Sequence, residues 1–293
     1  MKSGFVSIIG RPNAGKSTLL NAFLGEKIAA ISDKPQTTRN NITGILTEKD
    51  YQIVFIDTPG IHFPRNKLGE FMVKEAQQSY ESVEVVVLVV DEEAGENEND
   101  KIIENIKDLD VPVILAINKI DLNEKEKVLE LIKFYTDKME FDSVVPISAK
   151  NGDGVEILLE EITSRLKEGP MYYPDDEITD QTQRQLAAEI IREKTLLCLS
   201  DEVPHGVAVE VMSYKTNAKG ILEINATIYC EKKSHKGIIV GSGGNMIKKI
   251  GKLSRIDIEK MTDTKVFLEL WVKIKEDWRN SDSILKEFGY KSN

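Results

Sequence analysis

The residues with the clearest chemical meaning form one short segment, Gly10-Arg11-Pro12-Asn13-Ala14-Gly15-Lys16-Ser17-Thr18. It fits the phosphate-loop pattern GxxxxGK[ST], in which backbone N–H groups point at phosphate oxygens, Lys16 reaches the outer phosphates and the Ser17 hydroxyl binds Mg2+. An apolar run ends at Ile9 and a helical pattern starts at Leu19, which is the strand, loop and helix context that this loop requires. The expected nucleotide contacts here are Gly10, Asn13, Ala14, Gly15, Lys16, Ser17 and Thr18.

Two later loops carry groups that could respond to a γ-phosphate. Thr37 and Thr38 lie in a polar segment without periodicity, and a threonine hydroxyl there can supply a further ligand to Mg2+. The pattern leaves open which threonine this is. Asp57 ends the apolar run 51–57 and is followed by Thr58-Pro59-Gly60. Its carboxylate could hold the metal through water, and the Gly60 N–H could touch the γ-phosphate.

The base is indicated by Asn118-Lys119-Ile120-Asp121, which follows the apolar run 111–117. A carboxylate at Asp121 accepts hydrogen bonds from guanine N1–H and the 2-amino group, and adenine offers neither. Adenine would leave that desolvated carboxylate unpaired, which costs about 1–3 kcal/mol. We expect Asn118 to connect this loop to the phosphate loop and the Lys119 stem to pack on the ring. The predicted nucleotide is therefore GTP or GDP.

These loops need strands and helices to position them. A further apolar run, 144–147, ends in Ser148-Ala149-Lys150, whose backbone could contact guanine O6. Helical patterns separate the strand-like runs over residues 67–82, 100–109, 124–140 and 155–166. This alternation predicts an α/β fold, a doubly wound phosphate-loop domain with a mostly parallel sheet. The short connection between runs 42–47 and 51–57 demands an antiparallel hairpin at the sheet edge.

Length and composition indicate a globular protein of two domains. The chain has 293 residues, of which 41% are hydrophobic and 30% charged. It has no apolar stretch of the roughly 18 residues that span a bilayer and no secretory leader pattern, so we expect a cytoplasmic protein. Cys198 and Cys230 lack zinc-ligand spacing, and His62, His205 and His235 are far apart, so no structural metal site is predicted.

The second half of the chain has a different pattern. A stretch rich in Gly, Pro and acidic residues predicts a linker at 171–180, between a nucleotide-binding domain at 1–170 and a second domain at 181–293. That domain reads as a helix over 182–199, two strands, a helix, Gly241-Ser242-Gly243-Gly244, a second helix and a strand over 266–274. GSGG fits the GxxG loop of a KH domain, which clamps about four nucleotides of single-stranded nucleic acid.

Charge supports a polyanion partner for this half alone. The net charge is −10, but the acidic excess lies in the first half of the chain, and basic residues predominate around the glycine loop. The loop itself is neutral at Ser242 and Gly243, where many KH loops carry a basic residue. Phosphate affinity is then expected from backbone N–H groups and flanking lysines. The predicted RNA contacts are Lys236, Gly241, Ser242, Gly243, Gly244, Lys248 and Lys249.

The motifs GRPNAGKS, PQTTR, DTPG, NKID and SAK, in this order, resemble the Era family within the translation-factor-like branch of small GTP-binding proteins. The similarity extends through the second half, whose order of elements resembles a type II KH domain with a C-terminal helix. The resemblance implies GTP hydrolysis with Mg2+, with Ser17, Thr38 and Asp57 at the metal. It implies a catalytic set of Asn13, Lys16, Thr38, Asp57 and Gly60.

The resemblance also implies a slow intrinsic rate. Ile61 follows DTPG at the position where Ras-type enzymes use a glutamine to orient the attacking water, and isoleucine cannot form that hydrogen bond. Asn13 matches a residue that helps bind K+ in related GTPases without the glutamine, so K+ is a candidate cofactor.

The partners implied by the family are the 3′ region of small-subunit ribosomal RNA and the small ribosomal subunit, in whose assembly the protein would assist. A monomer without a DNA partner is expected, and peripheral membrane association is kept open. The alternatives are a GTPase acting on another structured RNA, a metabolic phosphoryl-transfer enzyme, and an RNA-binding module with a vestigial nucleotide site.

Overall fold

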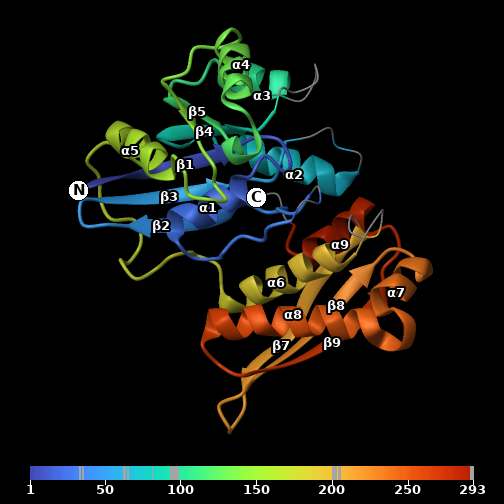
Figure 1. The fold of residues 1–293 in the computed structure, drawn as a ribbon. Coiled ribbons are helices and arrows are strands. Elements are labelled where there is room, and N and C mark those ends of the chain that lie inside the picture. Colours follow the sequence, from blue (N-terminus) through green and yellow to red (C-terminus); the bar gives the residue numbers. More distant parts are fainter. Residues whose placement is uncertain are drawn as a thin grey trace. The chain divides into compact units, whose positions relative to one another are not determined.

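The computed structural model describes residues 1–293 except 33, 35, 62, 63, 65, 81, 93–98, 200–202, 204, 205 and 291–293 (Figure 1). Pro35 of the PQTTR motif and the histidines His62 and His205 therefore lie outside the described residues. The chain forms two compact units. The first comprises Met1–Ala29, Thr38–Arg65 and Gly69–Asp180, and the second comprises Ala30–Thr37, Asn66–Leu68 and Gln181–Asn293.

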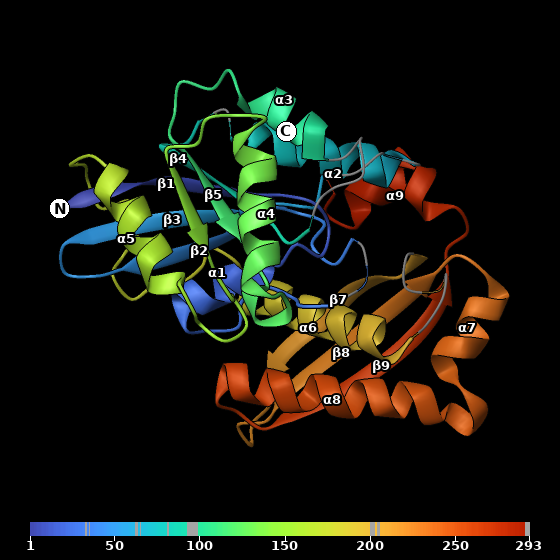
Figure 2. The same ribbon diagram turned by 45° about the horizontal axis from the view of Figure 1, so that its top comes forward.

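A six-stranded sheet forms the centre of the first unit, in the order β2-β3-β1-β4-β5-β6. Figure 2 shows its strands β1 to β5. Among its described strands only β2 and β3 pair antiparallel, which confirms the predicted edge hairpin and the mostly parallel α/β sheet. The strands are β1 Lys2–Ile9, β2 Ile42–Thr47, β3 Tyr51–Asp57, β4 Val85–Val90, β5 Val113–Ile117 and β6 Ser143–Pro146. The helices are α1 Lys16–Leu24, α2 Lys67–Gln78, α3 Asn99–Ile106, α4 Lys125–Thr136 and α5 Val155–Arg165, with a short 3-10 turn at Ile120–Leu122.

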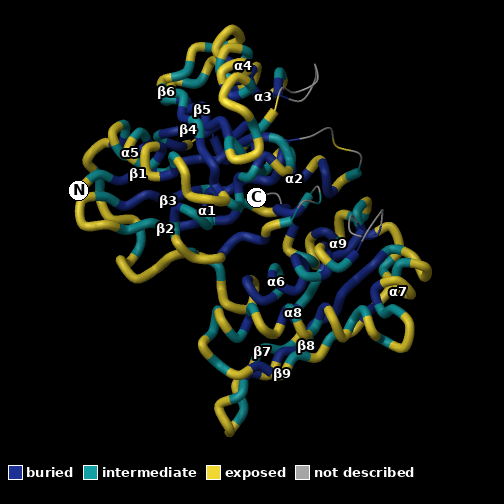
Figure 3. The backbone as a smooth tube through the Cα atoms, in the orientation of Figure 1, coloured by how far each residue is buried: buried dark blue, intermediate teal, exposed yellow. Residues whose placement is uncertain are grey.

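Helices cover both faces of this sheet. On one face Val6 lies beside Phe55, whose ring stacks on Phe23 of α1 at 4.6 Å between centroids. On the other face Ser7 Oγ lies 2.9 Å from Ser79 Oγ just after α2. Every residue of β4 is buried, as Figure 3 shows in dark blue, because parallel strands between two helical layers have no solvated face. This is the doubly wound arrangement that the alternating pattern predicted.

The predicted helices are found, but they end earlier than the apolar pattern suggested. The pattern extended to residue 140 for α4, whereas the helix ends at Thr136. Met139 and Phe141 follow the helix and still pack against the core of the sheet, as Leu109 does after α3. Apolar residues in a connection that returns to the core continue the sequence pattern beyond the helix itself.

The second unit is a three-stranded sheet with helices packed on it. Its elements are α6 Gln183–Cys198, β7 Ala208–Thr216, β8 Leu222–Cys230, α7 Lys233–Val240, a 3-10 turn at Ser242–Gly244, α8 Asn245–Thr262, β9 Val266–Ile274, a 3-10 turn at Trp278–Asn280 and α9 Asp282–Glu287. The strand order is β7-β8-β9, with β8 and β9 parallel. This is the predicted order of helix, two strands, two helices around a glycine loop, and strand. Among the described residues, no helix is both long and apolar enough to cross a bilayer.

Candidate nucleotide site and nucleic-acid interface

The phosphate loop joins β1 to α1, and two of its glycines are required by the backbone. At Gly10 φ is +150° and an added Cβ would lie 2.3 Å from the Val89 carbonyl oxygen. At Gly15 φ is +101° and an added Cβ would lie 2.1 Å from Asn118 Nδ2. Both contacts are far inside van der Waals distance, so any side chain would push the neighbouring strand or loop away. Asn13 is exposed on the same loop, with φ of 65°.

Lys16 begins α1 and is buried, and its ammonium donates to the carbonyl oxygens of Gly10 (3.1 Å) and Arg11 (2.7 Å). Burial lowers the pKa of Lys16 to about 8, against the opposing attraction of Asp57. A nearby anion stabilises the charged form of a buried lysine. The loop thus holds a desolvated positive charge where the pattern places the outer phosphates. Thr18 follows in the first turn of the helix and is half-buried.

Ser17, Thr38 and Asp57 converge at the end of β3. Ser17 Oγ lies 2.8 Å from Thr38 Oγ1 and donates to Asp57 Oδ2 at 2.6 Å. Asp57 Oδ1 is buried and has no hydrogen-bond partner among the described residues. Burial raises the pKa of Asp57 to about 6. Two hydroxyls and a carboxylate are the hard oxygen ligands that Mg2+ prefers, and the orphaned oxygen fits such a cation or its water.

The two neighbouring threonines differ in their partners. Thr37 Oγ1 donates to the Lys34 carbonyl oxygen at 2.6 Å, so its hydroxyl is engaged within its own segment. Thr38 Oγ1 lies 3.5 Å from Asp57 Oδ2 as well as close to Ser17. The geometry therefore favours Thr38 as the metal ligand, a choice that the sequence pattern alone left open.

Gly60 lies tightly against the phosphate loop, because an added Cβ would be 2.5 Å from the backbone nitrogen of Pro12. The next residue, Ile61, donates its N–H to the Gly10 carbonyl oxygen at 3.2 Å. Its side chain is only 7% exposed and packs in the core cluster with Tyr80 and Val83. Ile61, which occupies the position of the water-orienting glutamine in Ras-type enzymes, therefore points an apolar side chain into the core.

Asn118 connects the phosphate loop with the loop after β6, and its contact with the phosphate loop was predicted. Its Nδ2 donates to the Ala14 carbonyl oxygen at 2.7 Å, and its Oδ1 accepts from the Ala149 N–H at 3.0 Å. The buried residue Ser148 donates to Asp121 Oδ1 at 2.7 Å. One amide therefore ties together the phosphate loop and the loop that follows β6, while Ser148 orients the carboxylate.

Lys119 and Lys150 complete the predicted base contacts. Lys119 has φ of 62°, and its ammonium lies 2.5 Å from Asp91 Oδ2 at the end of β4. That ion pair fixes the lysine stem beside the loop. Lys150 is exposed and follows Ala149 at the turn. The residues predicted for the nucleotide lie at the carboxyl ends of the strands, in the loops that follow them or in the first turn of α1.

The glycine loop of the second unit has the backbone that only glycine adopts readily. The φ angles are 71° at Gly241, 57° at Gly243 and 77° at Gly244. An added Cβ at Gly241 would lie 2.7 Å from Met246 Cβ at the start of α8. At Gly243 nothing lies within 4 Å of the added atom, and Ser242 is exposed. The loop therefore packs at its first glycine and is open at its middle.

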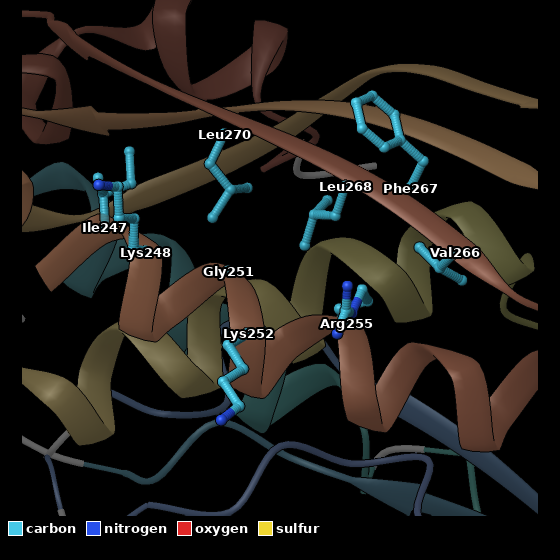
Figure 4. Close-up of a pocket in the computed structure, with 9 residues that line it drawn as sticks. All are labelled: Ile247, Lys248, Gly251, Lys252, Arg255, Val266, Phe267, Leu268 and Leu270. Carbon is cyan, nitrogen blue, oxygen red and sulfur yellow. The ribbon is translucent and has the colours of Figure 1, made fainter. Parts of the chain in front are cut away.

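A groove of about 400 Å³ lies between α8 and β9 (Figure 4). Lys248, Lys252 and Arg255 line it from the helix, and Leu268 and Leu270 of β9 point toward that helix as an apolar wall. The full lining is Ile247, Lys248, Gly251, Lys252, Arg255, Val266, Phe267, Leu268 and Leu270. A cationic rim beside an apolar wall suits a strand that presents phosphates on one side and unstacked bases on the other.

Only part of the predicted RNA set borders this groove. Lys248 does, whereas Lys236 and Lys249 are not among the lining residues, and Lys249 lies on the side of α8 near Cys198. Lys252 and Arg255, which line the groove, were not among the predicted RNA contacts. Their spacing from Lys248 by four and seven residues puts all three on one helix face, a signal that could have found them.

Both halves of the chain match known families. Residues 5–119 match the family model described as 50S ribosome-binding GTPase, and residues 202–279 match that of the KH domain. GTPase Era of Ruminiclostridium cellulolyticum is 53% identical over 293 residues, which is 100% of this chain and 98% of that protein. GTPase Era of Clostridium botulinum strain Hall is 52% identical over 292 residues, 99% of each chain. The chain belongs to the Era family of GTPases.

Solved structures of the family match over the full length. A point variant of Aquifex aeolicus Era bound to GDP·AlF4− has a TM-score of 0.95, and Era with MgGDPNP and nucleotides 1506–1542 of 16S ribosomal RNA has one of 0.96. Each is 40% identical and covers 100% of both chains. The fold is thus a phosphate-loop GTPase domain followed by a KH domain, and the protein is a GTPase.

Proposed function

We propose that the protein is a GTP-driven switch that binds the 3′ region of small-subunit ribosomal RNA and assists assembly of the small ribosomal subunit. The observation that carries this proposal is the full-length likeness to the Era structure that holds nucleotides 1506–1542 of 16S ribosomal RNA. The groove between α8 and β9 supports it, because its cations and apolar wall suit a single strand. Another structured RNA is the alternative.

The description of the model over residues 5–119 names the 50S ribosome, which would favour a target on the large subunit. That model covers the GTPase half alone. The relative with 16S ribosomal RNA covers the whole chain, KH domain included, so it has more weight for the RNA target.

At the nucleotide, Lys16 and the backbone of the phosphate loop would hold the phosphates. Ser17, Thr38 and Asp57 would hold Mg2+, which neutralises phosphate charge when bound. The Gly60 N–H would touch the γ-phosphate. The loops of Asn118, Lys119, Asp121 and Ser148-Ala149-Lys150 would hold guanine, with the Asp121 carboxylate accepting from N1–H and the 2-amino group. These contacts make GTP a better substrate than ATP.

Hydrolysis is proposed to be slow without a further factor. Ile61 is buried in the core and cannot orient water. Asn13 is proposed to help hold K+ beside the phosphates, where the ion would offset charge that develops during cleavage. The test is the GTPase rate in K+ against Na+ at equal ionic strength. A faster rate in K+ is expected, and equal rates would contradict the role of K+.

At the RNA, backbone N–H groups of Gly241-Ser242-Gly243-Gly244 would clamp the strand while Lys248, Lys252 and Arg255 meet its phosphates. Lys236 and Lys249 are proposed as flanking contacts outside the groove.

We further propose a GTPase domain at 1–170, a linker at 171–180 and a KH domain at 181–293. The protein is proposed to be a cytoplasmic monomer without a DNA partner. Peripheral membrane association can be tested by sedimenting the protein with lipid vesicles.

The deciding experiment compares binding of an oligonucleotide from the 3′ end of the small-subunit RNA with a scrambled oligonucleotide of the same composition. Gly243→Asp, which puts a carboxylate at the open middle of the loop, should lower the affinity at least about tenfold. Gly220→Asp is a matched control: φ is 74°, nothing lies within 4 Å of an added Cβ, and the site is in the β7–β8 turn. Equal binding of both oligonucleotides would refute the 3′ target, and equal loss in both variants would refute the loop's role.

A small-molecule phosphoryl acceptor is the competing class. The guanine loop and the hydroxyl at Thr38 argue against it, since both fit a nucleotide-state switch rather than a donor site alone. Release of inorganic phosphate in step with GTP loss, without any added acceptor, is the expected result. A requirement for an acceptor would favour the competing class.

A further inference from the structure

One segment of the first half of the sequence belongs to the second unit. Residues Ala30–Thr37 lie in the connection between α1 and β2, yet they cluster with Gln181–Asn293, and the first unit resumes at Thr38. The boundary thus falls directly before the threonine that lies beside Ser17 and Asp57. The contacts that hold Thr37 in place therefore constrain the position of Thr38.

Two consecutive residues of α6 hold this segment. An Nη2–H of Arg192 donates to the Thr37 carbonyl oxygen, and Glu193 Oε2 accepts from the Ile31 N–H at 3.4 Å. Both charged residues are almost completely buried, with Arg192 only 1% exposed. Segment 30–37 is thus hydrogen-bonded near each of its ends by one turn of one helix.

The bond to Thr37 constrains Thr38 directly. The Thr37 carbonyl and the Thr38 N–H and Cα lie in one peptide plane, which cannot twist without a large energy cost. A cation that fixes the carbonyl oxygen therefore fixes the direction in which the chain enters Thr38. Hydrogen bonds from a charged donor are about twice as strong as neutral ones, so this contact is well suited to that task.

Packing alone does not explain Arg192. Its guanidinium pairs with Glu189 and with Thr37, while Nη1 is buried without a hydrogen-bond partner among the described residues. Burying a charged group with an unsatisfied donor is unfavourable compared with an apolar side chain of similar size. Such a group calls for a specific explanation.

The neighbouring lysine extends these contacts to the RNA groove. Lys194 pairs with Glu193 at 3.0 Å and with Asp257 of α8 at 2.6 Å. Asp257 lies on the helix whose Lys248, Lys252 and Arg255 line the groove. Three consecutive residues of α6 thus contact segment 30–37 on one side and α8 on the other.

We propose that Arg192 and Glu193 are positioning residues that hold segment 30–37 so that the Thr38 hydroxyl can reach the metal when GTP is bound. This inference rests on the proposed role of Thr38. Preference for GTP over GDP then depends on α6 of the second unit, because Thr38 engages the metal only with the γ-phosphate in place. GDP binding does not use this contact.

The test uses the full-length chain and compares Arg192→Lys with Arg184→Lys. Arg184 lies on the same helix and also donates to a backbone carbonyl, that of Val211 in β7 at 3.0 Å, so it matches the chemistry without touching segment 30–37. With Mg2+, R192K should bind GDPNP about tenfold more weakly and GDP as before. R184K should change neither. Thr38→Ala should reproduce the loss, and adding R192K to it should cost nothing more.

Two results would overturn this inference in distinguishable ways. If T38A loses preference for GDPNP and folded R192K keeps it, the positioning role is wrong and the proposed metal site stands. If T38A also keeps the preference, the role of Thr38 fails and the inference fails with it. Should R192K not fold, as judged by circular dichroism and GDP binding, Glu193→Gln replaces it. E193Q keeps an acceptor but loses the charge, so a smaller loss of GDPNP affinity is expected and no loss would refute the role of α6.

Discussion

Gly15→Ala tests whether the phosphate loop and the guanine loop act as one site. The added methyl would lie 2.1 Å from Asn118 Nδ2, so the asparagine must move. Asn118 joins the Ala14 carbonyl oxygen (2.7 Å) to the Ala149 N–H (3.0 Å). One methyl group in the phosphate loop should therefore disturb the base site through a single side chain.

The magnitude follows from the contacts. A residue with a Cβ at positive φ costs about 1–2 kcal/mol, and each of the two hydrogen bonds of Asn118 contributes about 1 kcal/mol. Gly25→Ala is a matched control at the other end of α1, since φ is +66° and nothing lies within 4 Å of the added Cβ. Gly25→Ala therefore introduces the backbone strain without displacing a neighbouring side chain. The difference between the variants should be about 2 kcal/mol, or about 30-fold in GDP affinity.

The assay is GDP binding measured by calorimetry for both variants, with thermal unfolding recorded in parallel. G25A should lose stability but keep its GDP affinity. G15A should lose both, and its discrimination between GDP and IDP, which lacks the 2-amino group, should weaken. If G15A binds GDP like G25A, Asn118 does not couple the two loops and the reasoning is wrong.

Three further predictions concern the KH half. Burial, followed by the hydrogen bond from its phenol to Glu210 (3.0 Å), raises the pKa of Tyr229 to about 12. Because the folded state then keeps its proton longer than the unfolded state, stability should fall as pH rises from about 10 to 12, and tyrosinate absorbance in Glu210→Gln should appear at lower pH. Lys252→Gln should lower the slope of log K for RNA against log salt by about 0.7, and Lys249→Gln by less; equal slopes would place the strand outside the groove. Asp257→Asn should reduce the factor by which RNA and GDPNP raise each other's affinity, measured in both directions, and an unchanged factor would show that the Lys194 contact does not transmit it.

Much of the nucleotide site could be predicted because its parts are local. A phosphate loop needs glycines, a lysine and a hydroxyl within eight consecutive residues, and the parallel strands bring the other loops to the same edge of the sheet. The contact of Asn118 with the phosphate loop was expected for this reason. Thr37 and Thr38 could not be told apart, because both offer the same hydroxyl one residue apart. Only the fold shows that Thr37 bonds to Lys34 and Thr38 faces Asp57.

The groove between α8 and β9, the proposed RNA site, was harder to predict because strand pairing forms half of it. Leu268 and Leu270 read as ordinary strand residues, and only the pairing of β9 with β8 makes β9 an edge strand whose side chains face α8. The glycine loop was visible because its positive φ angles require glycine. Exposure alone does not identify the side of α8 that faces the groove, since Lys248 and Lys249 are both exposed, and only the spacing of Lys248, Lys252 and Arg255 distinguishes that side.

The division of the chain gives the most direct physical reason to expect coupling between the two ligands. The two short segments that cluster with the second unit, Ala30–Thr37 and Asn66–Leu68, lie in sequence next to Thr38 and shortly after Gly60. Those are the two residues assigned to the γ-phosphate and its metal. We therefore expect a movement of either residue on hydrolysis to act on the neighbouring segments that cluster with the second unit. By linkage, RNA that stabilises one arrangement of that core changes the affinity for GTP by the same factor as GTP changes the affinity for RNA. We expect loss of the hydrogen bond from Arg192 to the Thr37 carbonyl oxygen to reduce this mutual effect on GTP and RNA affinity more than loss of any other single contact.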